Sequence, residues 1–131
     1  MKLLLDTHIW LWSEFEPERL SRRVTSGLTD PRNELWISPI STWEIVSLNR
    51  KQRVELGAPT QIWVHMSSER LSLREAPLTH EVVLAMESVK LPHRDPADTL
   101  LAATAKVYGL TLVTADRHIL AGSGFSILAN R

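Results

Sequence analysis

The chain has 131 residues, 44% hydrophobic and 23% charged, which is typical of one globular domain with a real core and excludes a disordered chain. The absence of cysteine excludes disulfides, zinc–thiolate sites and thiol nucleophiles. Fifteen basic and fifteen acidic residues give zero formal net charge, so any binding of nucleic acid must come from a local basic patch or from bridging metal ions.

The first predicted element is a buried strand, Leu3–Leu5, that runs directly into Asp6. This apolar run is too short for a signal-peptide core or a membrane span, so we expect a cytoplasmic protein. Helical segments are predicted at 7–12 and at 18–28, on either side of a Glu-Pro break. The ELWIS segment, residues 34–38, is the second predicted strand.

A helix is predicted over 40–50, with Pro39 at its start. Its apolar stripe is expected to comprise Ile40, Trp43, Val46 and Leu48. The remaining predicted elements are a helix at 60–68, a short strand in RLSLRE, a helix from Thr79 to about Val89, a helix at 96–108 between Asp95 and Gly109, the strand TLVT, a helix at 116–120 and the strand FSILA. Strands alternate with helices, which predicts a single α/β domain over residues 1–131 around a mainly parallel sheet.

The tryptophans are mostly candidates for the core, and they are Trp10, Trp12, Trp36, Trp43 and Trp63. Trp10 and Trp12 cannot both point into the core from one short helical turn. We therefore expect one of these two side chains to face a groove that binds a partner peptide or stacks on a base.

Four carboxylates fall at corresponding places along the chain. Asp6 follows the first strand, and Asp116 follows the strand TLVT. Glu44 lies in the first turns of the helix after ELWIS, and Asp98 lies in the first turn of the helix at 96–108. Because the carboxyl ends of parallel strands meet at one edge of a sheet, we expect all four acids at that edge.

Each acid also has a purely structural explanation. Asp6 and Asp116 can cap the helices that follow them. Glu44 stands at capping-box spacing after Ser41, and Asp98 suits the positive end of its helix. These explanations leave the convergence unexplained, because carboxylates crowded at one edge repel each other unless cations lie between them. Hard oxygen ligands of this kind favour Mg²⁺ or Mn²⁺ over zinc.

Other acidic α/β sites match less well. A phosphoaspartate hydrolase would carry DxD after the first strand, where this chain has Asp6-Thr7-His8, and a phospho-receiver domain would carry an acidic pair and a late lysine. Neither GxxxxGK[ST] nor GxGxxG is present, so use of a nucleotide cofactor is not expected. Two carboxylate-bound cations can instead activate water for in-line attack on a phosphodiester.

The segments LLLDTHIWLW, STWEI, HRDPADTLLAATA and TLVTADRHI, in this order and spacing, resemble PIN-domain proteins, and among them the VapC-type toxins of bacterial type II toxin–antitoxin modules. The resemblance covers nearly the whole chain. It implies a PIN-like three-layer α/β/α fold and a Mg²⁺- or Mn²⁺-dependent endoribonuclease. The catalytic, metal-binding acids that it implies are Asp6, Glu44, Asp98 and Asp116.

The same resemblance assigns supporting residues. Thr7 and Thr114 match small hydroxyl residues beside the acids, and Asp95 matches an extra acid that either binds metal through water or caps its helix, the role we favour. Arg94 and Arg117 adjoin motif acids and are candidates for RNA contact. Where similar chains often carry arginine after the DPAD acid, this chain has threonine, which bears on substrate choice.

Toxins of this type are expected to be homodimers, with no membrane attachment, held in check by a cognate VapB-type antitoxin whose C-terminal segment lies across the acidic cleft. Two alternatives remain. One is a PIN nuclease that acts on DNA or structured nucleic acid outside any toxin module. The other is a catalytically silent module whose acidic cleft only receives a basic peptide, and metal-dependent cleavage distinguishes it.

Overall fold

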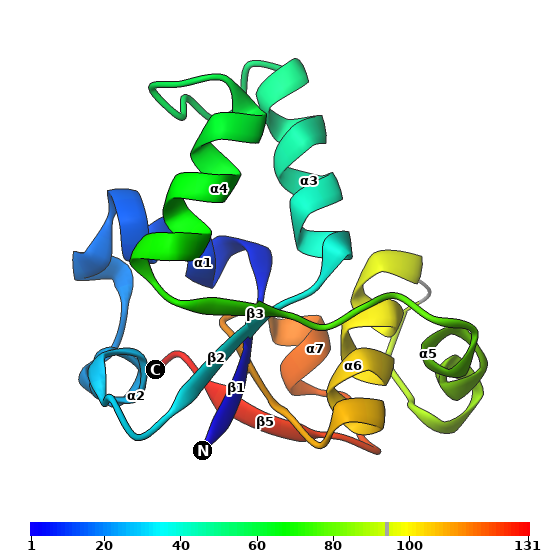
Figure 1. Cartoon of the computed structure of the whole chain (residues 1–131). Coiled ribbons are helices and arrows are strands. Elements are labelled where there is room, and N and C mark those ends of the chain that lie inside the picture. The colour runs from blue at the N-terminus through cyan, green and yellow to red at the C-terminus, as the bar shows by residue number, and fades with distance from the viewer. Residues whose placement is uncertain (94) are drawn as a thin grey trace.

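The computed structural model describes residues 1–93 and 95–131. The described residues form a five-stranded sheet in the order β3-β2-β1-β4-β5, with parallel pairing throughout (Figure 1). The strands are β1 Lys2–Leu5, β2 Glu34–Ile37, β3 Leu73–Glu75, β4 Thr111–Thr114 and β5 Ser126–Ala129. This confirms the predicted strands and their parallel arrangement.

The helices connect consecutive strands. They are α1 Thr7–Phe15, α2 Arg22–Thr29, α3 Pro39–Arg50, α4 Thr60–Arg70, α5 His80–Leu84, α6 Pro96–Tyr108 and α7 Arg117–Leu120, with 3₁₀ turns at Pro17–Arg19 and Ala85–Ser88. In Figure 1, α3 and α4 stand side by side and extend away from the sheet. Within the described ranges, no helix is long and apolar enough to cross a membrane.

The predicted helix at 18–28 is wrong at its start. Residues Pro17–Arg19 form a 3₁₀ turn, and α2 begins only after Ser21. The Ser21 hydroxyl accepts a hydrogen bond from Val24 N over 3.2 Å, and its own backbone N–H donates to Asn130 Oδ1 over 2.7 Å. These contacts hold Ser21 in an extended conformation, so it acts as the N-cap and interrupts the helix.

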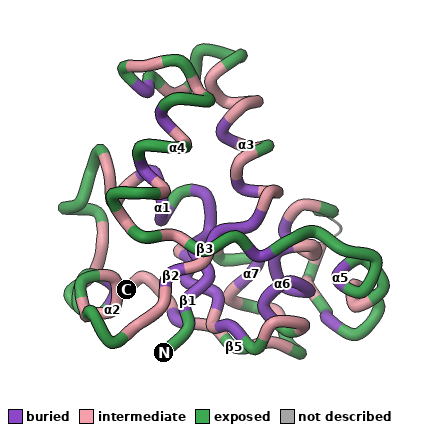
Figure 2. The backbone as a smooth tube through the Cα atoms, viewed as in Figure 1, coloured by how far each residue is buried: buried purple, intermediate pink, exposed green. Residues whose placement is uncertain are grey.

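The sheet is covered on both faces, and Leu3, Leu4 and Leu5 of the central strand β1 are fully buried, whereas Lys2 at its start is exposed (Figure 2). Because side chains alternate along a strand, Leu3 and Leu5 point to one face and Leu4 to the other. One face packs against residues of α1, α3 and α4, among them Ile9, Trp10, Ile45 and Trp63. The other face packs against residues of α6 and α7, namely Leu101, Ala105 and Ile119. The predicted three-layer α/β/α arrangement is confirmed.

α3 buries a different face from the predicted stripe. Its buried residues are Ser41 and Ile45, whereas Trp43 is 59% exposed. Successive helical residues are about 100° apart, so Trp43 lies almost opposite Ser41 and cannot share a buried face with it. The stripe that packs inward therefore runs through Ser41 and Ile45 to the partly buried Leu48.

The two tryptophans of α1 differ in how far they are buried. Trp10 is fully buried and donates from Nε1 to Ser67 Oγ over 2.8 Å. Trp12 is only half-buried, and the guanidinium of Arg19 lies 4.1 Å from its ring centroid. Trp12 nevertheless packs against the same core cluster as Trp10, so the prediction that only one of the two points into the core is wrong. That one of them binds a partner peptide or a base stays a prediction. Trp63 also packs in the core, 5.2 Å from Trp10 between ring centroids.

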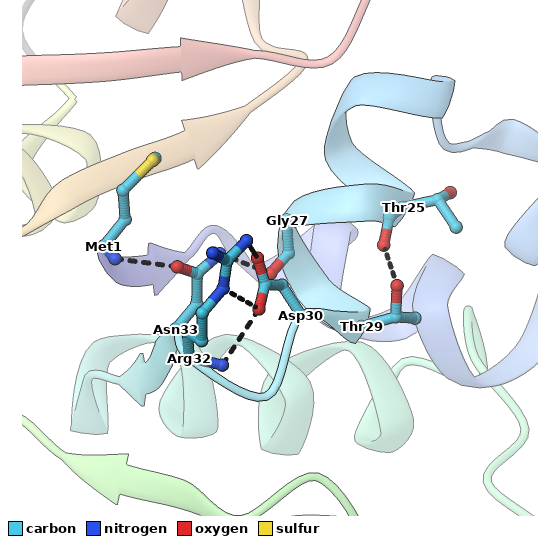
Figure 3. Close-up of polar contacts among 7 residues, drawn as sticks. All are labelled: Met1, Thr25, Gly27, Thr29, Asp30, Arg32 and Asn33. Atoms are coloured by element: carbon cyan, nitrogen blue, oxygen red, sulfur yellow. Dashed lines mark hydrogen bonds and ion pairs between the residues drawn. The ribbon is translucent and has the colours of Figure 1, made fainter.

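Polar contacts tie the amino edge of the sheet to the turn before β2 (Figure 3). The N-terminal amino group of Met1 donates to Asn33 Oδ1 over 2.7 Å, and Asn33 Nδ2 donates to the Gly27 carbonyl over 2.9 Å. Arg32 forms a forked pair with Asp30, over 3.1 and 2.9 Å. These contacts fix the position of the start of β1 relative to the start of β2. The carboxyl ends of the two parallel strands therefore also lie at one edge of the sheet.

Candidate functional site

The candidate site lies at the carboxyl edge of the sheet, where the chain order reverses. β1 pairs with β2 on one side and with β4 on the other, so the chain builds one half of the sheet before crossing to the second. Ligands of open parallel sheets bind outside the strand ends at such a switch point. Asp6 directly follows β1 and Asp116 follows β4 after one residue, so both acids flank the switch point.

Asp6 is held by the ends of two strands. It is only 7% exposed, its Oδ1 accepts from Thr7 N over 2.8 Å, and its Oδ2 accepts from Thr114 Oγ1 over 2.6 Å. Burial raises the pKa of this carboxyl, and the hydrogen bonds from Thr114 and Thr7 oppose that rise. Asp6 therefore caps α1, as the structural explanation requires, and also presents a carboxylate to the edge of the sheet.

Glu44 is fixed by a contact between two helices. Thr7 Oγ1 donates to Glu44 Oε1 over 2.8 Å, which joins α1 to α3. The capping-box explanation for Glu44 is wrong, because Ser38 is the N-cap of α3 and its hydroxyl accepts from Ile40 N over 3.0 Å. Burial raises the pKa of Glu44, and the negative charges of Asp6 and Asp95 raise it further.

Asp98 lies at the centre of the acidic cluster. It is the third residue of α6 and is 8% exposed. Burial, as the largest cause, and the negative charges of neighbouring acids together raise its pKa to about 7; these acids are Asp95, Asp116, Asp6 and Glu44. Charges act on a carboxyl in this way only from nearby. The structure thus brings the four predicted acids together with Asp95.

Asp116 and Asp95 are both helix caps. Asp116 Oδ1 accepts from His118 N over 2.8 Å, and Asp95 Oδ1 accepts from Ala97 N over 2.9 Å. The helix-capping role favoured for Asp95 is therefore present in the structure. Asp116 also donates from its backbone N to Thr114 Oγ1 over 3.0 Å, so the Thr114 hydroxyl connects the two acids that flank the switch point.

The cluster fits a hard divalent cation in its donor set. Carboxylate oxygens of this kind are typical ligands of Mg²⁺ and Mn²⁺. The Ser41 hydroxyl is fully buried one turn before Glu44 and has no hydrogen-bond partner among the described residues. A buried polar group of this kind is commonly satisfied by an ordered water or an ion. Over the same residues, no three His, Asp or Glu side chains stand close enough to hold an ion as they lie. Asp6, Asp95 and Asp116 each use a carboxylate oxygen to cap a helix.

The remaining predicted residues fall at different places. Arg117 is exposed at the first position of α7, beside Asp116. Arg94 lies outside the described residues. Thr99 Oγ1 donates to the Asp95 carbonyl over 3.0 Å, so this threonine closes the first turn of α6. The sequence interpretation did not single out the buried Ser41 hydroxyl, which lies three residues before Glu44 on α3.

The comparisons with known proteins agree with this geometry. The family model of the PIN domain matches residues 3–122. The chain belongs to the PIN-domain family. Ribonuclease VapC22 from Mycobacterium tuberculosis is 35% identical to this PIN domain over 120 residues, which cover 89% of this chain and 88% of the relative. The resemblance inferred from the four motifs is confirmed.

Solved structures show the same PIN fold. VapBC2 from Rickettsia felis, bound to a DNA fragment from its promoter, contains a chain with TM-score 0.69 and 17% identity, and 98% of each chain is covered. DNA-bound VapBC from Salmonella typhimurium gives a TM-score of 0.62 at 16% identity, with 100% of this chain and 99% of the other covered. VapBC-1 from nontypeable Haemophilus influenzae gives 0.61 at 16% identity, with 98% of each covered.

Proposed function

We propose that this PIN domain is a Mg²⁺- or Mn²⁺-dependent endoribonuclease and the toxin of a toxin–antitoxin pair. The observation that carries the proposal is the position of Asp98, a buried carboxyl whose pKa is raised to about 7 beside four other acids. Such a cluster is stable in its ionised form only when cations neutralise it. The 35% identity to a protein named a ribonuclease supports RNA as the substrate.

In the proposed site, Asp6, Asp98 and Asp116 are the main metal-binding acids, and Glu44 completes the site directly or through water. A bound cation would lower the pKa of water for in-line attack and neutralise charge on the phosphate and the leaving oxygen. Glu44, whose pKa is raised by burial, would orient the attacking water.

The threonines of the site act through the acids. Thr114 donates to Asp6, and Thr7 donates to Glu44. Each hydrogen bond restricts the rotation of one carboxylate, so fewer side-chain orientations compete with the one that would bind a cation. Arg117, exposed beside Asp116, would contact phosphates of the bound RNA.

The proposed partner is a VapB-type antitoxin. The structural neighbours with the PIN fold were solved as VapBC complexes, which supports a partner of that kind. The C-terminal segment of the antitoxin would lie across the acidic cleft and place a basic side chain among the carboxylates, in place of the cation and the phosphate. We also propose a cytoplasmic homodimer, the usual assembly expected of such toxins.

The test is cleavage of total cellular RNA by purified, antitoxin-free protein, with Mg²⁺ or Mn²⁺ and with EDTA. Asp98→Asn and Asp6→Asn are the inactive variants, and Asp30→Asn, the same change at the opposite edge of the sheet, is the matched control. We expect discrete fragments that require metal, persist in the control and vanish in both site variants. No cleavage by the unaltered protein would favour the silent module that only receives a basic peptide.

A further inference from the structure

A groove with basic and aromatic walls lies between α1 and the turn that follows α3. Its volume is about 420 Å³, and its walls include His8, Trp12, Arg19, Leu48 and Arg53. Arg19 ends the 3₁₀ turn after α1, and Arg53 lies in the turn after α3. Each of the two segments that bound the groove therefore supplies one guanidinium group.

The groove begins beside the acidic cluster. Burial raises the pKa of Asp6 and of Glu44, and positive charge on His8 opposes both rises. A charge acts on a carboxyl in this way only from nearby, so the His8 end of the groove adjoins the two acids. Trp12 lies one helical turn further along α1, 5.9 Å from His8 between ring centroids, and Arg19 lies over the far side of this sequence of rings, 4.1 Å from the Trp12 centroid.

Arg19 is oriented by the indole and keeps its donors available. Its guanidinium stacks on Trp12, which restricts the plane of the charged group. The ion pair with Glu16, over 3.6 Å, joins two half-exposed side chains and contributes little. Among the residues that the structure describes, the guanidinium of Arg19 donates no hydrogen bond, so its N–H groups are free to bind a phosphate.

The turn after α3 brings three further cations to the opposite side. Arg50, Lys51 and Arg53 are exposed, and none of them forms an ion pair with an acid in the described part of the chain. Gln52 has a φ of 56°, and Arg53 N donates to the Leu48 carbonyl over 2.9 Å. This reversal of the chain ends the helix and returns Arg53 to the level of Leu48, at the wall of the groove.

We propose that this groove binds the single strand of substrate RNA next to the bond that is cut, with its phosphates on Arg53 and Arg19. The inference rests on the proposed ribonuclease function and places the strand that leads away from the acidic cluster. The chain has zero formal net charge, so binding of nucleic acid needs a local basic patch. The groove supplies such a patch and adjoins the acids at its His8 end.

The charges around the groove favour a polyanion over an apolar protein segment as the occupant. Two acids, Glu16 and Glu55, also line it, but Glu16 faces Arg19. The excess of positive charge therefore lies on the turn after α3, where residues 50–53 carry three cations and no acid. Phosphates that bind such cations release counterions, which favours a nucleic-acid strand in particular.

The first test is the salt dependence of RNA binding by protein that carries Asp98→Asn, which should bind RNA without cutting it. Fluorescence anisotropy of a short, unstructured, labelled RNA gives the affinity over a series of KCl concentrations at fixed Mn²⁺. The slope of log affinity against log KCl should become shallower by about 0.7 with Arg53→Gln or Arg19→Gln, the value of one phosphate contact on a single strand. Arg23→Gln is the matched control, because Arg23 is exposed on α2, outside the groove, and its loss should leave the slope unchanged.

Steady-state cleavage gives a second, independent result. Arg53→Gln should raise KM roughly threefold with kcat unchanged, since loss of one exposed ion pair weakens binding by about that factor. Arg53→Lys keeps the charge and should recover most of the loss. If the unaltered protein cleaves RNA and Arg53→Gln and Arg19→Gln match Arg23→Gln in both KM and salt slope, the inference is overturned. The nuclease proposal would then stand, and the groove would be assigned to a peptide partner.

Discussion

The hydroxyl of Thr114 donates a hydrogen bond of 2.6 Å to Oδ2 of Asp6, joining two residues that are 108 positions apart. The same hydroxyl accepts from the backbone N–H of Asp116 over 3.0 Å, so its single proton is directed to Asp6. One buried side chain thus sets the position of a carboxylate from β1 relative to the residues that follow β4.

Thr114→Val should therefore reduce RNA cleavage by about tenfold, because an unfixed Asp6 carboxylate is a poorer ligand. The fold should persist, with a loss of about 1 kcal/mol in the free energy of unfolding from the missing hydrogen bond. The matched control is Thr104→Val, since Thr104 is also buried but donates to the Leu100 carbonyl over 2.7 Å. Equal cleavage by the two variants would show that the Thr114 hydroxyl does not position the Asp6 carboxylate for catalysis.

Asp98→Asn should abolish cleavage and stabilise the metal-free protein at neutral pH. The pKa of Asp98 has its ordinary value of 3.8 in the unfolded chain and is about 7 in the folded protein. The unfolded state therefore loses this proton first, and stability falls as the pH rises from about 4 to about 7. The variant removes this penalty, so at pH 8 its free energy of unfolding should exceed that of the unaltered protein by on the order of 2 kcal/mol.

Urea unfolding in EDTA at pH 5 and pH 8 checks this expectation. Asp30→Asn is an informative control, because hydrogen bonds and the charge of Arg32 lower the pKa of Asp30 to about 2. An acid with a lowered pKa stabilises the fold above its unfolded pKa, so this variant should not gain stability at pH 8. A gain equal to that of Asp98→Asn would show that removing any negative charge stabilises the protein.

Divalent cations should raise the melting temperature of the unaltered protein, since they bind the folded cluster and not the unfolded chain. The rise should be larger at pH 7.5 than at pH 5.5, because the proton held by Asp98 below its pKa of about 7 competes with the cation. EDTA should reverse it. A thermal scan with Mn²⁺ that gives equal shifts for the unaltered protein and for Asp6→Asn would contradict binding at this cluster.

Ser41→Ala should raise the free energy of unfolding of the metal-free protein by about 1 kcal/mol, because a buried hydroxyl without a partner is unfavourable. The same change should reduce the stabilisation by Mn²⁺ if this hydroxyl orders water around the cation. Ser67→Ala is the control with the opposite sign, since Ser67 accepts a hydrogen bond from Trp10 Nε1 and its loss leaves that buried donor unpaired. If Ser41→Ala destabilised the fold as Ser67→Ala does, Ser41 would have a structural partner.

Features with a local cause were predictable from the sequence. α6 begins after Asp95 and ends before Gly109, as expected from a capping acid followed by proline and from a glycine with φ of 65°. The strands were recognisable because short apolar runs ended at charged or turn residues. The four acids were predicted to converge since parallel strands direct their carboxyl ends to one edge.

Features that depend on distant partners were not predictable. The buried stripe of α3 was misplaced, because apolar spacing alone does not show which side of a helix faces the sheet. Ser21 interrupts the predicted helix at 18–28 through a bond to Asn130, more than a hundred residues away. Only the folded chain shows which hydroxyl reaches Asp6 and which lacks a partner.

By itself, the sequence determined the alternation of strands and helices, the caps of α6 and the set of acids that follow the strands, since each depends on neighbouring residues. The tertiary structure decided that Asp6 shares a hydroxyl with Asp116, that Ser41 is buried and that Trp43 is open beside the acids. The physical reason is that burial and hydrogen bonding depend on packing between elements remote along the chain, which local patterns do not encode.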